Sequence, residues 1–383
     1  MTIASMPRLR TRELISLRLS ALGLHRPPRG SGIEHSLAQT HRMLAVQGQD
    51  LPGTLWAIAA RSDTATRAQV EDLFNSGQLI RTWVFRGTLH VLTREQAVRV
   101  MSLMGPRALK TSTRRRADLG LTEAVIDRAR ETLIEALRDQ DGLTRAEVRQ
   151  LWSHAGLALE DGRLYHLIVT CCMHGDVVWG AIDGTDQKLS LAPWHTGSEG
   201  SALKFPHDVD ETYDHIIRGI IAGRGPLSAE DISYWSTFGK SVVARSLERL
   251  ATDLTWVTVP HSTVPFVAPT EQLDAALPSK LPGAHLNAGF DELLLGYRDR
   301  SPQLVPGDID RIVPGRNGMF KAHVVRNGVV AGTWTRKDRS KDSAVLVSLF
   351  DGQAPNAAFE KALARQAIRY GRYLERPVSF SLV

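Results

Sequence analysis

Two or three helices followed by two strands recur three times along this chain of 383 residues, and this repeated pattern constrains the fold more than any other feature. In the first copy, apolar residues at helical spacing predict helices at about 34–47, 52–61 and 67–76. Strands are predicted at 79–86 and 88–92. The chain therefore begins with a small helical module that ends in a strand pair.

The second and third copies begin with helix-capping residues. Thr144 and Glu147 have the spacing of a capping box, and Ser228 precedes a helix that begins Ala229-Glu230-Asp231. A basic helical connector, 107–138, leads into the second copy. Each copy then has a further helix and two strands, predicted at 164–172, 176–180 and 189–192 and at 240–250, 255–259 and 265–268. A helix–turn–helix followed by a hairpin is the winged-helix arrangement, which is related to the helix-turn-helix readers of DNA.

From about residue 287 the chain becomes rich in strands. Asn327-Gly328 is the strongest two-residue hairpin signal, and it lies between strands predicted at 320–325 and 329–335. A helix at 356–374 is flanked by strands at 344–350 and 378–382. This pattern predicts a partly open β-barrel. The expected fold is α+β, with three tandem winged-helix domains and a C-terminal β-barrel-like domain, at 1–105, 106–200, 201–284 and 285–383.

Composition narrows the class of partner. The formal net charge of +6 favours a polyanion. Cys171 and Cys172 are the only cysteines, so we expect neither a disulfide framework nor a zinc site. The sequence contains no signal peptide and no apolar stretch long enough to span a bilayer, and we expect the protein in the cytoplasm, without membrane association.

The stretch Val46-Gln47-Gly48-Gln49-Asp50 is the most unusual local motif. Gly48 tolerates backbone angles that other residues resist, and Pro52 is suited to open a helix. We therefore expect a tight helix-to-helix junction at which the amides of Gln47 and Gln49 face one cleft. Asp50 occupies a helix-capping position, and we favour a cap over a catalytic role for it. Two neutral amides suit a reaction that needs positioning and partial charge rather than proton transfer.

Basic residues form three clusters, each of which is either a solvated surface or a phosphate-binding site. The clusters are Lys110, Arg114, Arg115 and Arg116; Arg336, Lys337, Arg339 and Lys341, in a loop between strands; and Arg365, Arg369, Arg372 and Arg376, the first three on one helix face. Taken together, they make nucleic acid the most economical partner. We expect Trp83 to belong to the core, and Asp291 and Glu292 to pair locally with charged residues near Arg298.

Several segments together resemble the bacterial winged-helix DNA glycosylases of the AlkZ-like type. They are Val46-Gln47-Gly48-Gln49-Asp50, Arg81-Thr82-Trp83-Val84-Phe85-Arg86-Gly87-Thr88-Leu89-His90, Asp291-Glu292-Leu293-Leu294-Leu295-Gly296-Tyr297-Arg298-Asp299-Arg300, Asn317-Gly318-Met319-Phe320 and Gly332-Thr333-Trp334. The resemblance extends from about residue 12 to the C-terminus. The run that includes Trp83, Arg86 and His90 is its most specific part.

The resemblance implies a C-shaped clamp around duplex DNA. It also implies an enzyme that excises N7-alkylated purines and unhooks interstrand crosslinks, with Gln47 and Gln49 as the catalytic pair. Because a purine made cationic by alkylation leaves without a lysine nucleophile, we expect a monofunctional enzyme without lyase activity. We expect Arg86 and His90 to join the three basic clusters in binding DNA that carries alkylated or crosslinked bases. We also expect a monomer that needs no cofactor and no metal.

Two other functions fit the same pattern. Winged helices are common in transcriptional regulators, so the chain can also be read as a non-catalytic DNA-binding protein. Against that reading, three units in tandem with a barrel and no coiled-coil heptads are unusual for a regulator. The other reading is a lesion-binding protein that sequesters damage without turnover. A footprint on a specific promoter favours the first, and damage-selective binding without base release favours the second.

Overall fold

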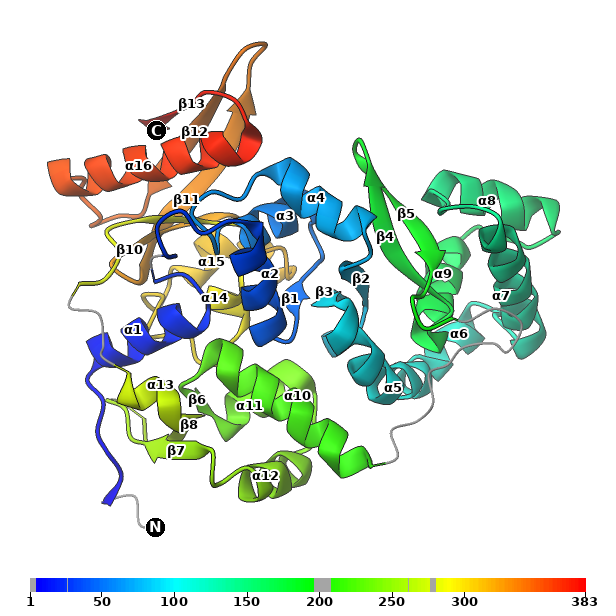
Figure 1. The fold of residues 1–383 in the computed structure, drawn as a ribbon, viewed down its shortest axis with the longest axis horizontal. Helices are drawn as coiled ribbons and strands as arrows, with labels where there is room; N and C mark the ends of the chain where they lie inside the picture. The colour runs from blue at the N-terminus through cyan, green and yellow to red at the C-terminus, as the bar shows by residue number, and fades with distance from the viewer. Residues whose placement is uncertain (1–4, 26, 196–207, 261, 276–279) are drawn as a thin grey trace. The chain divides into compact units, whose positions relative to one another are not determined.

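The computed structural model describes residues 5–25, 27–195, 208–260, 262–275 and 280–383 (Figure 1). The chain divides into two compact units. Unit 1 comprises residues 1–70 and 213–383, and unit 2 comprises residues 71–212. Helix α4 (Arg67–Asn75) crosses the boundary between them. Across the described residues, no helix is both long and apolar enough to cross a membrane.

Unit 2 is built from a four-stranded antiparallel arrangement and five helices. Its elements are β2 (Leu79–Trp83), the 3-10 turn η2 (Phe85–Gly87), β3 (Leu89–Thr93), α5 (Arg94–Thr111), α6 (Thr113–Asp118), α7 (Glu123–Arg138), α8 (Arg145–His154), α9 (Arg163–His174), β4 (Val177–Asp183) and β5 (Asp186–Leu191). The strand order is β3-β2-β4-β5, and Arg81 pairs with Trp179. The two hairpins predicted from sequence therefore share one sheet.

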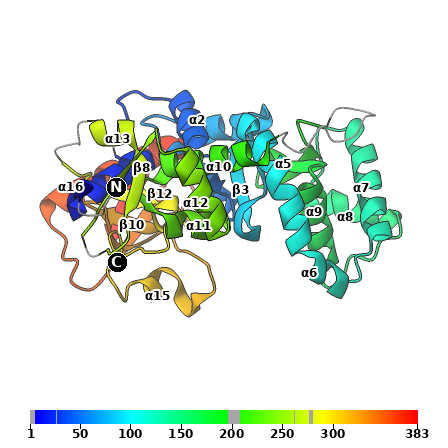
Figure 2. The ribbon, with the colours of Figure 1, turned by 90° about the horizontal axis from the view of Figure 1, so that it is seen from below.

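Helix α9 organises the core of unit 2, and it lies between α5 and α7 (Figure 2). Trp152 of α8 is fully buried, and its indole N–H donates to the Ala129 carbonyl at 3.0 Å. The predicted capping box of α8 is confirmed, because the Thr144 side chain accepts from the Glu147 backbone and Glu147 accepts from Thr144 in return. Trp83 lies in the core as expected.

Three helices and a three-stranded sheet follow in unit 1. They are α10 (Val209–Arg224), which begins at the boundary, β6 (Leu227–Ser228), α11 (Ala229–Ser236), α12 (Lys240–Arg249), β7 (Leu254–Val257) and β8 (Phe266–Pro269). The sheet order is β6-β8-β7, and both pairings are antiparallel. Ser228 caps α11 through a reciprocal bond with Asp231, which confirms the predicted helix start.

The remaining part of unit 1 contains a five-stranded sheet, helices that precede and follow its strands in sequence, and one short strand, β1, that is not part of that sheet. Its elements are α1 (Thr11–Ala21), α2 (Ile33–Arg42), β1 (Val46–Gln47), α3 (Leu51–Ala59), α13 (Thr270–Asp274), β9 (His285–Asn287), α14 (Glu292–Leu295), α15 (Ile309–Ile312), η4 (Pro314–Arg316), β10 (His323–Arg326), β11 (Val329–Asp338), β12 (Ser343–Leu349), α16 (Ala357–Leu374) and β13 (Val378–Leu382). Asn327 and Gly328 both adopt positive φ in the β10–β11 turn, as a two-residue hairpin requires.

The expected C-terminal barrel is an open sheet. Its strand order is β13-β12-β11-β10-β9, and no closed barrel is present in the part of the chain that the structure describes. The cause is the direction of β13, which returns through α16 and pairs parallel to β12. A parallel return needs a helical crossover, so the last strand extends the sheet instead of closing it.

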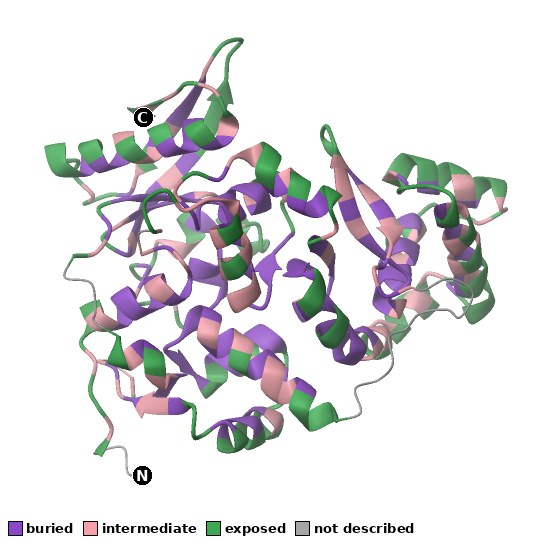
Figure 3. Cartoon of the chain, viewed as in Figure 1, coloured by how far each residue is buried: buried purple, intermediate pink, exposed green. Residues whose placement is uncertain are grey.

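Aromatic side chains hold α16 against the sheet and α3. One face of α16 is buried and the other is exposed (Figure 3). Tyr370 lies 4.8 Å from the Trp56 ring and 5.2 Å from the Trp334 ring, each pair edge to face. Trp56 donates to the Leu286 carbonyl at 2.7 Å, and Trp334 donates to the Asn287 carbonyl at 2.8 Å. Helix α3, which follows the glutamine motif directly, is thereby fixed to β9.

Candidate active site

The glutamine motif begins on a short strand, which contains Gln47 but not Gln49, rather than at the end of a long helix. The predicted helix at 34–47 ends at Arg42, and Val46–Gln47 forms β1. The chain leaves the helix at Leu44, whose φ of 65° is left-handed. That angle is unfavourable for leucine by itself, so packing and hydrogen bonds from elsewhere in unit 1 must stabilise it.

Arg224, the last residue of α10, supplies those hydrogen bonds. Its Nη1 donates to the Met43 carbonyl at 2.9 Å, and its Nη2 donates to the Ala45 carbonyl at 2.8 Å. Its guanidinium also lies 4.0 Å from the centre of the Trp235 ring. Backbone carbonyls that would otherwise accept intrahelical bonds are therefore bound by a cation, which ends α2 five residues before the predicted position.

Glu292 completes the arrangement from the other side. Its Oε2 accepts from Arg224 Nε at 2.9 Å and from the Trp235 indole at 2.9 Å. Its Oε1 accepts from the backbone N–H of Gln47 at 3.1 Å. Both Arg224 and Glu292 have no exposed surface. A buried ion pair of this kind is retained only when hydrogen bonds satisfy its remaining polar atoms, as they do here.

A second buried ion pair lies next to the first. Arg61 and Asp291 are 3.4 Å apart, and Arg61 Nε also contacts the Met43 sulfur at 3.2 Å. Asp291 caps α14 by accepting from the Leu293 N–H at 2.9 Å. The prediction that Asp291 and Glu292 pair locally, near Arg298, was wrong. Both pair with arginines distant in sequence because the start of α14 is buried and the charged residues near Arg298 do not reach it.

Two glycines of α10 let the motif segment approach closely. A Cβ at Gly223 would lie 2.6 Å from the Met43 Cα, and a Cβ at Gly219 would lie 2.9 Å from the Leu44 Cβ. Real Cβ atoms do not approach other heavy atoms this closely. Larger residues at these two positions would therefore displace residues 43–44, which immediately precede β1.

The two amides of the motif differ in exposure. Gln47 is 6% exposed, whereas Gln49 is exposed. The Gln47 carbonyl accepts from the Thr54 hydroxyl at 3.1 Å, which ties the strand to α3. Asp50 occupies the N-cap position of α3 as expected, but its carboxylate accepts no capping bond and instead lies over Gly53. The motif therefore combines a buried glutamine, whose backbone is hydrogen-bonded within unit 1, with an exposed one.

The predicted DNA-binding residues of unit 2 differ in their burial and in their contacts. His90 is fully buried, its Nδ1 is 3.1 Å from the Thr88 carbonyl, and its ring packs on Phe85. Arg86 is half-buried and left-handed, with φ 55°. Arg116 donates to the Leu109 carbonyl at 2.7 Å near the end of α5. Lys110, Arg114 and Arg115 are exposed, and Arg115 contacts His166 at 3.4 Å.

In unit 1 five of the predicted basic residues lie on β11 or α16, whereas Arg339 and Lys341 lie in the loop after β11 and Arg376 follows α16. Arg336 and Lys337 lie on β11 rather than in a loop, because the strand runs to Asp338. Arg336 is 3.1 Å from Asp338 and 3.4 Å from the Tyr370 hydroxyl. Arg365, Arg369 and Arg372 lie on one face of α16, as their spacing predicted, and all three line one pocket. Of these three, Arg369 is buried, and it donates to the carbonyls of Ala60 and Ser62.

Sequence reasoning missed Arg224 as a positioning residue. Its position carried a signal, since it continues the apolar face of α10 formed by Ile217, Ile220 and Ile221. A charged residue on such a face is buried and needs a partner. Groups of three or more His, Cys, Asp and Glu side chains that could hold a metal are absent from the described ranges.

Comparisons with known proteins agree on one family. The family model described as DNA glycosylase AlkZ-like matches residues 40–373. The chain is 25% identical over 338 residues to an interstrand DNA cross-link repair glycosylase of Streptomyces sahachiroi, covering 85% of this chain and 88% of that protein. Its fold is similar to that of the Streptomyces sahachiroi DNA glycosylase AlkZ, with a TM-score of 0.75, 22% identity, and coverage of 98% and 100% of the two chains.

Proposed function

The chain belongs to the AlkZ-like DNA glycosylase family, and from that premise we propose that it hydrolyses the N-glycosidic bond of N7-alkylated purines in duplex DNA. We further propose that it acts as a monomer without lyase activity and that it unhooks interstrand crosslinks. The name of the Streptomyces sahachiroi relative, an interstrand DNA cross-link repair glycosylase, supports the last part.

Winged-helix units are part of the same proposal. In unit 1, the order α10, β6, α11, α12, β7 and β8 gives three helices and a three-stranded sheet that ends in a hairpin. We assign winged-helix domains to 1–105, 106–200 and 201–284, and the open C-terminal sheet to a fourth domain at 285–383. Helices of such modules bind duplex DNA through backbone and groove contacts.

The proposed chemistry begins with a weakened bond. Alkylation at N7 makes the purine cationic, so the C1′–N9 bond can break without protonation of the base. Its electron pair moves to N9 and neutralises the ring, and an oxocarbenium ion develops at C1′. Water adds to C1′ and releases a proton to solvent, which leaves an abasic site and the free base.

The fixed backbone of residues 43–47 is the observation that supports this mechanism most strongly. Arg224 and Glu292 hold the backbone groups of Met43, Ala45 and Gln47 at 2.8–3.1 Å before any substrate is present. Dipoles held in place in advance stabilise developing charge without reorganisation. We propose that the side-chain amide oxygens of Gln47 and Gln49 orient the water and stabilise the oxocarbenium ion.

Duplex DNA contacts are proposed for the basic residues in two groups. Lys110, Arg114, Arg115 and Lys337 are exposed and can bind backbone phosphates directly. The same group includes Arg336, Arg365 and Arg372, which are exposed too, and the last two border a pocket. The second group is half-buried or buried and comprises Arg86, His90, Arg116 and Arg369. We propose that these residues support DNA binding indirectly, by fixing the backbone beneath the surface that contacts the duplex.

Purified full-length protein and duplexes with a single N7-methylguanine test this proposal. We expect release of free 7-methylguanine, an abasic product that breaks only after alkali treatment, and conversion of an N7-linked crosslink into separable strands. An unmodified duplex is the control. Specific footprinting on a promoter without base release would instead support the regulator, and tight lesion binding without release would support sequestration.

A further inference from the structure

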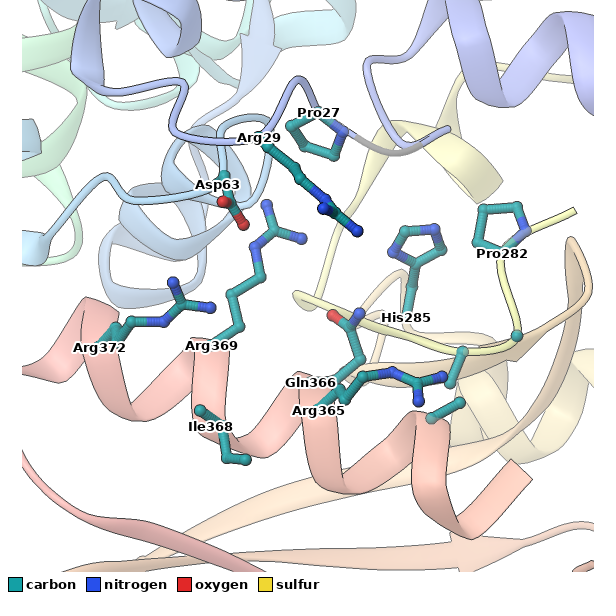
Figure 4. Close-up of a pocket in the computed structure, with 13 residues that line it drawn as sticks. Pro27, Arg29, Asp63, Pro282, His285, Arg365, Gln366, Ile368, Arg369 and Arg372 are labelled. Carbon is teal, nitrogen blue, oxygen red and sulfur yellow. The ribbon is translucent and has the colours of Figure 1, made fainter. Parts of the chain in front are cut away.

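A pocket in unit 1 is separate from the glutamine motif. It is a cavity of about 520 Å³ between α16, β9 and the segment 27–29 (Figure 4). Arg369, at its inner side, donates to carbonyls just after the C-terminal end of α3, whereas the motif precedes the N-terminal end of that helix. The nine residues of α3 are roughly 13 Å long. The volume is within the range of small-molecule sites.

Positive charge dominates the lining of this pocket. Four arginines line it, Arg29, Arg365, Arg369 and Arg372, against one carboxylate, Asp63. Asp63 already accepts from the backbone N–H of Gly30 at 3.1 Å. Throughout the described ranges, no carboxylate forms an ion pair with Arg29, Arg365 or Arg372. The lining therefore carries a net positive charge that an anion would neutralise.

Two buried polar side chains show that the pocket is more than a group of surface arginines. Arg369 is 9% exposed and remains charged at neutral pH, although burial lowers its pKa to about 10. His285 is 5% exposed, and its Nε2 has no hydrogen-bond partner in the described chain. Burial and the nearby Arg369 lower the pKa of His285 to about 3, so the ring is neutral. A buried ring nitrogen without a partner is costly unless a ligand bonds it.

The side chains converge on one space. Figure 4 shows His285 extending from β9 and Arg29, Gln366 and Arg369 extending toward the same volume. Apolar surface is present as well, from residues that include Pro27, Pro282 and Ile368. A ligand that fills the pocket therefore needs an anionic group for the arginines and a flat or apolar portion for the remaining walls.

We propose that this pocket binds a nucleotide, with the phosphate held by the arginines and the nucleoside against the prolines. Guanidinium groups bind both carboxylate and phosphate through paired hydrogen bonds. A phosphate monoester carries close to two negative charges and three acceptor oxygens, so it can bind several of the four arginines at once, which favours it here over a single carboxylate. The phosphate has two sources, a free mononucleotide or the 5′ end of a DNA strand. The site goes beyond the proposed glycosylase activity, since it lies at the other end of α3 from the catalytic pair.

Isothermal titration of the full-length protein tests the pocket. The probes are deoxyguanosine 5′-monophosphate, deoxyguanosine, inorganic phosphate, and one oligonucleotide with and without a 5′-phosphate. We compare the wild type with the double variant Arg365→Gln/Arg372→Gln, whose two side chains are exposed. Arg128→Gln, an exposed arginine on α7 outside the pocket, is the matched control.

We expect saturable binding of the mononucleotide or of the 5′-phosphorylated strand, weakened at least about tenfold in the double variant and unchanged in Arg128→Gln. Binding of the mononucleotide identifies the free ligand, and binding of the phosphorylated strand alone identifies the strand end. Equal affinity for inorganic phosphate and the mononucleotide would overturn the nucleoside part. Absence of binding by both nucleotide probes, or equal binding by the double variant, would overturn the proposal.

Thermal melting of the same three proteins distinguishes a loss of nucleotide binding from a loss of folding. Exposed substitutions of this kind usually change stability by less than about 0.5 kcal/mol, so all three proteins should melt together. If the protein binds the nucleotide through the two arginines but releases no alkylated base, the pocket proposal is supported and the glycosylase proposal is contradicted. If the protein releases alkylated base but binds no nucleotide, the glycosylase proposal is supported and the pocket proposal is contradicted.

Discussion

Arg224 and Glu292 form a fully buried ion pair of 2.9 Å, and each also bonds the backbone that carries the glutamine motif. The pair therefore connects the end of α10 and the start of α14 to residues 43–47. Tyr297 extends the link, because its hydroxyl donates to the Arg224 carbonyl at 2.9 Å. The backbone N–H of Gln47 is thus bound by a charged pair that has no exposed surface.

Removal of the carboxylate should strongly destabilise unit 1. Glu292→Ala leaves Arg224 buried without a counterion, and we expect a loss of about 3–5 kcal/mol in the free energy of unfolding. Glu230→Gln is the matched control, since it breaks the exposed 2.7 Å pair with Arg298, a change expected to cost under about 1 kcal/mol. Urea denaturation measures both. Equal losses would contradict the role assigned to the buried pair.

A single methyl group at Gly223 should displace the motif. Alanine in a helix interior normally stabilises by about 1 kcal/mol relative to glycine. At Gly223 the added Cβ would lie 2.6 Å from the Met43 Cα, so we expect a lower melting temperature and slower base release. In Gly239→Ala the added Cβ meets no atom within 4 Å, and base release should be retained. A Gly223→Ala protein with normal stability and activity would refute the close-packing argument.

Salt dependence should reveal which basic residues contact DNA. Lys110 and Arg114 are exposed, and each phosphate contact contributes about 0.9 to the slope of log affinity against log salt concentration. We expect Lys110→Gln/Arg114→Gln to reduce that slope by roughly 2. Arg128→Gln, exposed on α7, is the control and should retain the wild-type slope. Fluorescence anisotropy with labelled duplex at several salt concentrations measures it, and an unchanged slope in the double variant would exclude these contacts.

Acid should destabilise the protein partly through His285. Burial lowers its pKa in the folded protein to about 3, below its ordinary value of about 6.5, so the unfolded chain takes up the proton first. This contribution to stability is complete above about pH 6.5 and declines toward pH 3, by at most about 1.4 kcal/mol per pH unit. His285→Asn should flatten the decline between these values. Parallel profiles of unfolding free energy against pH in both proteins would contradict this.

Local sequence signals predicted most elements of the fold correctly. Thr144 with Glu147, Ser228 with Asp231, and Asn327-Gly328 each act over a few residues, and each forms as expected. The direction of β13 could not be predicted, because a strand pattern is the same for parallel and antiparallel pairing. The family resemblance is confirmed by the match over residues 40–373.

The candidate site was only partly predictable, since its geometry depends on contacts distant in sequence. The motif Gln47-Gly48-Gln49 could be recognised, but the early end of α2 could not. That end depends on Arg224, 181 positions from Met43. The buried partners of Asp291 and Glu292 were missed for the same reason, because charged neighbours in sequence offered a simpler local pairing.

Single-turnover release of 7-methylguanine by Gln49→Ala tests the central claim most directly. Gln49 is exposed, so the variant should fold and melt like the wild type. If a pre-positioned amide completes the cleavage of a weakened bond, release should slow by about 100-fold or more, with lesion binding largely retained. Release at the wild-type rate by a folded Gln49→Ala protein would contradict the mechanism.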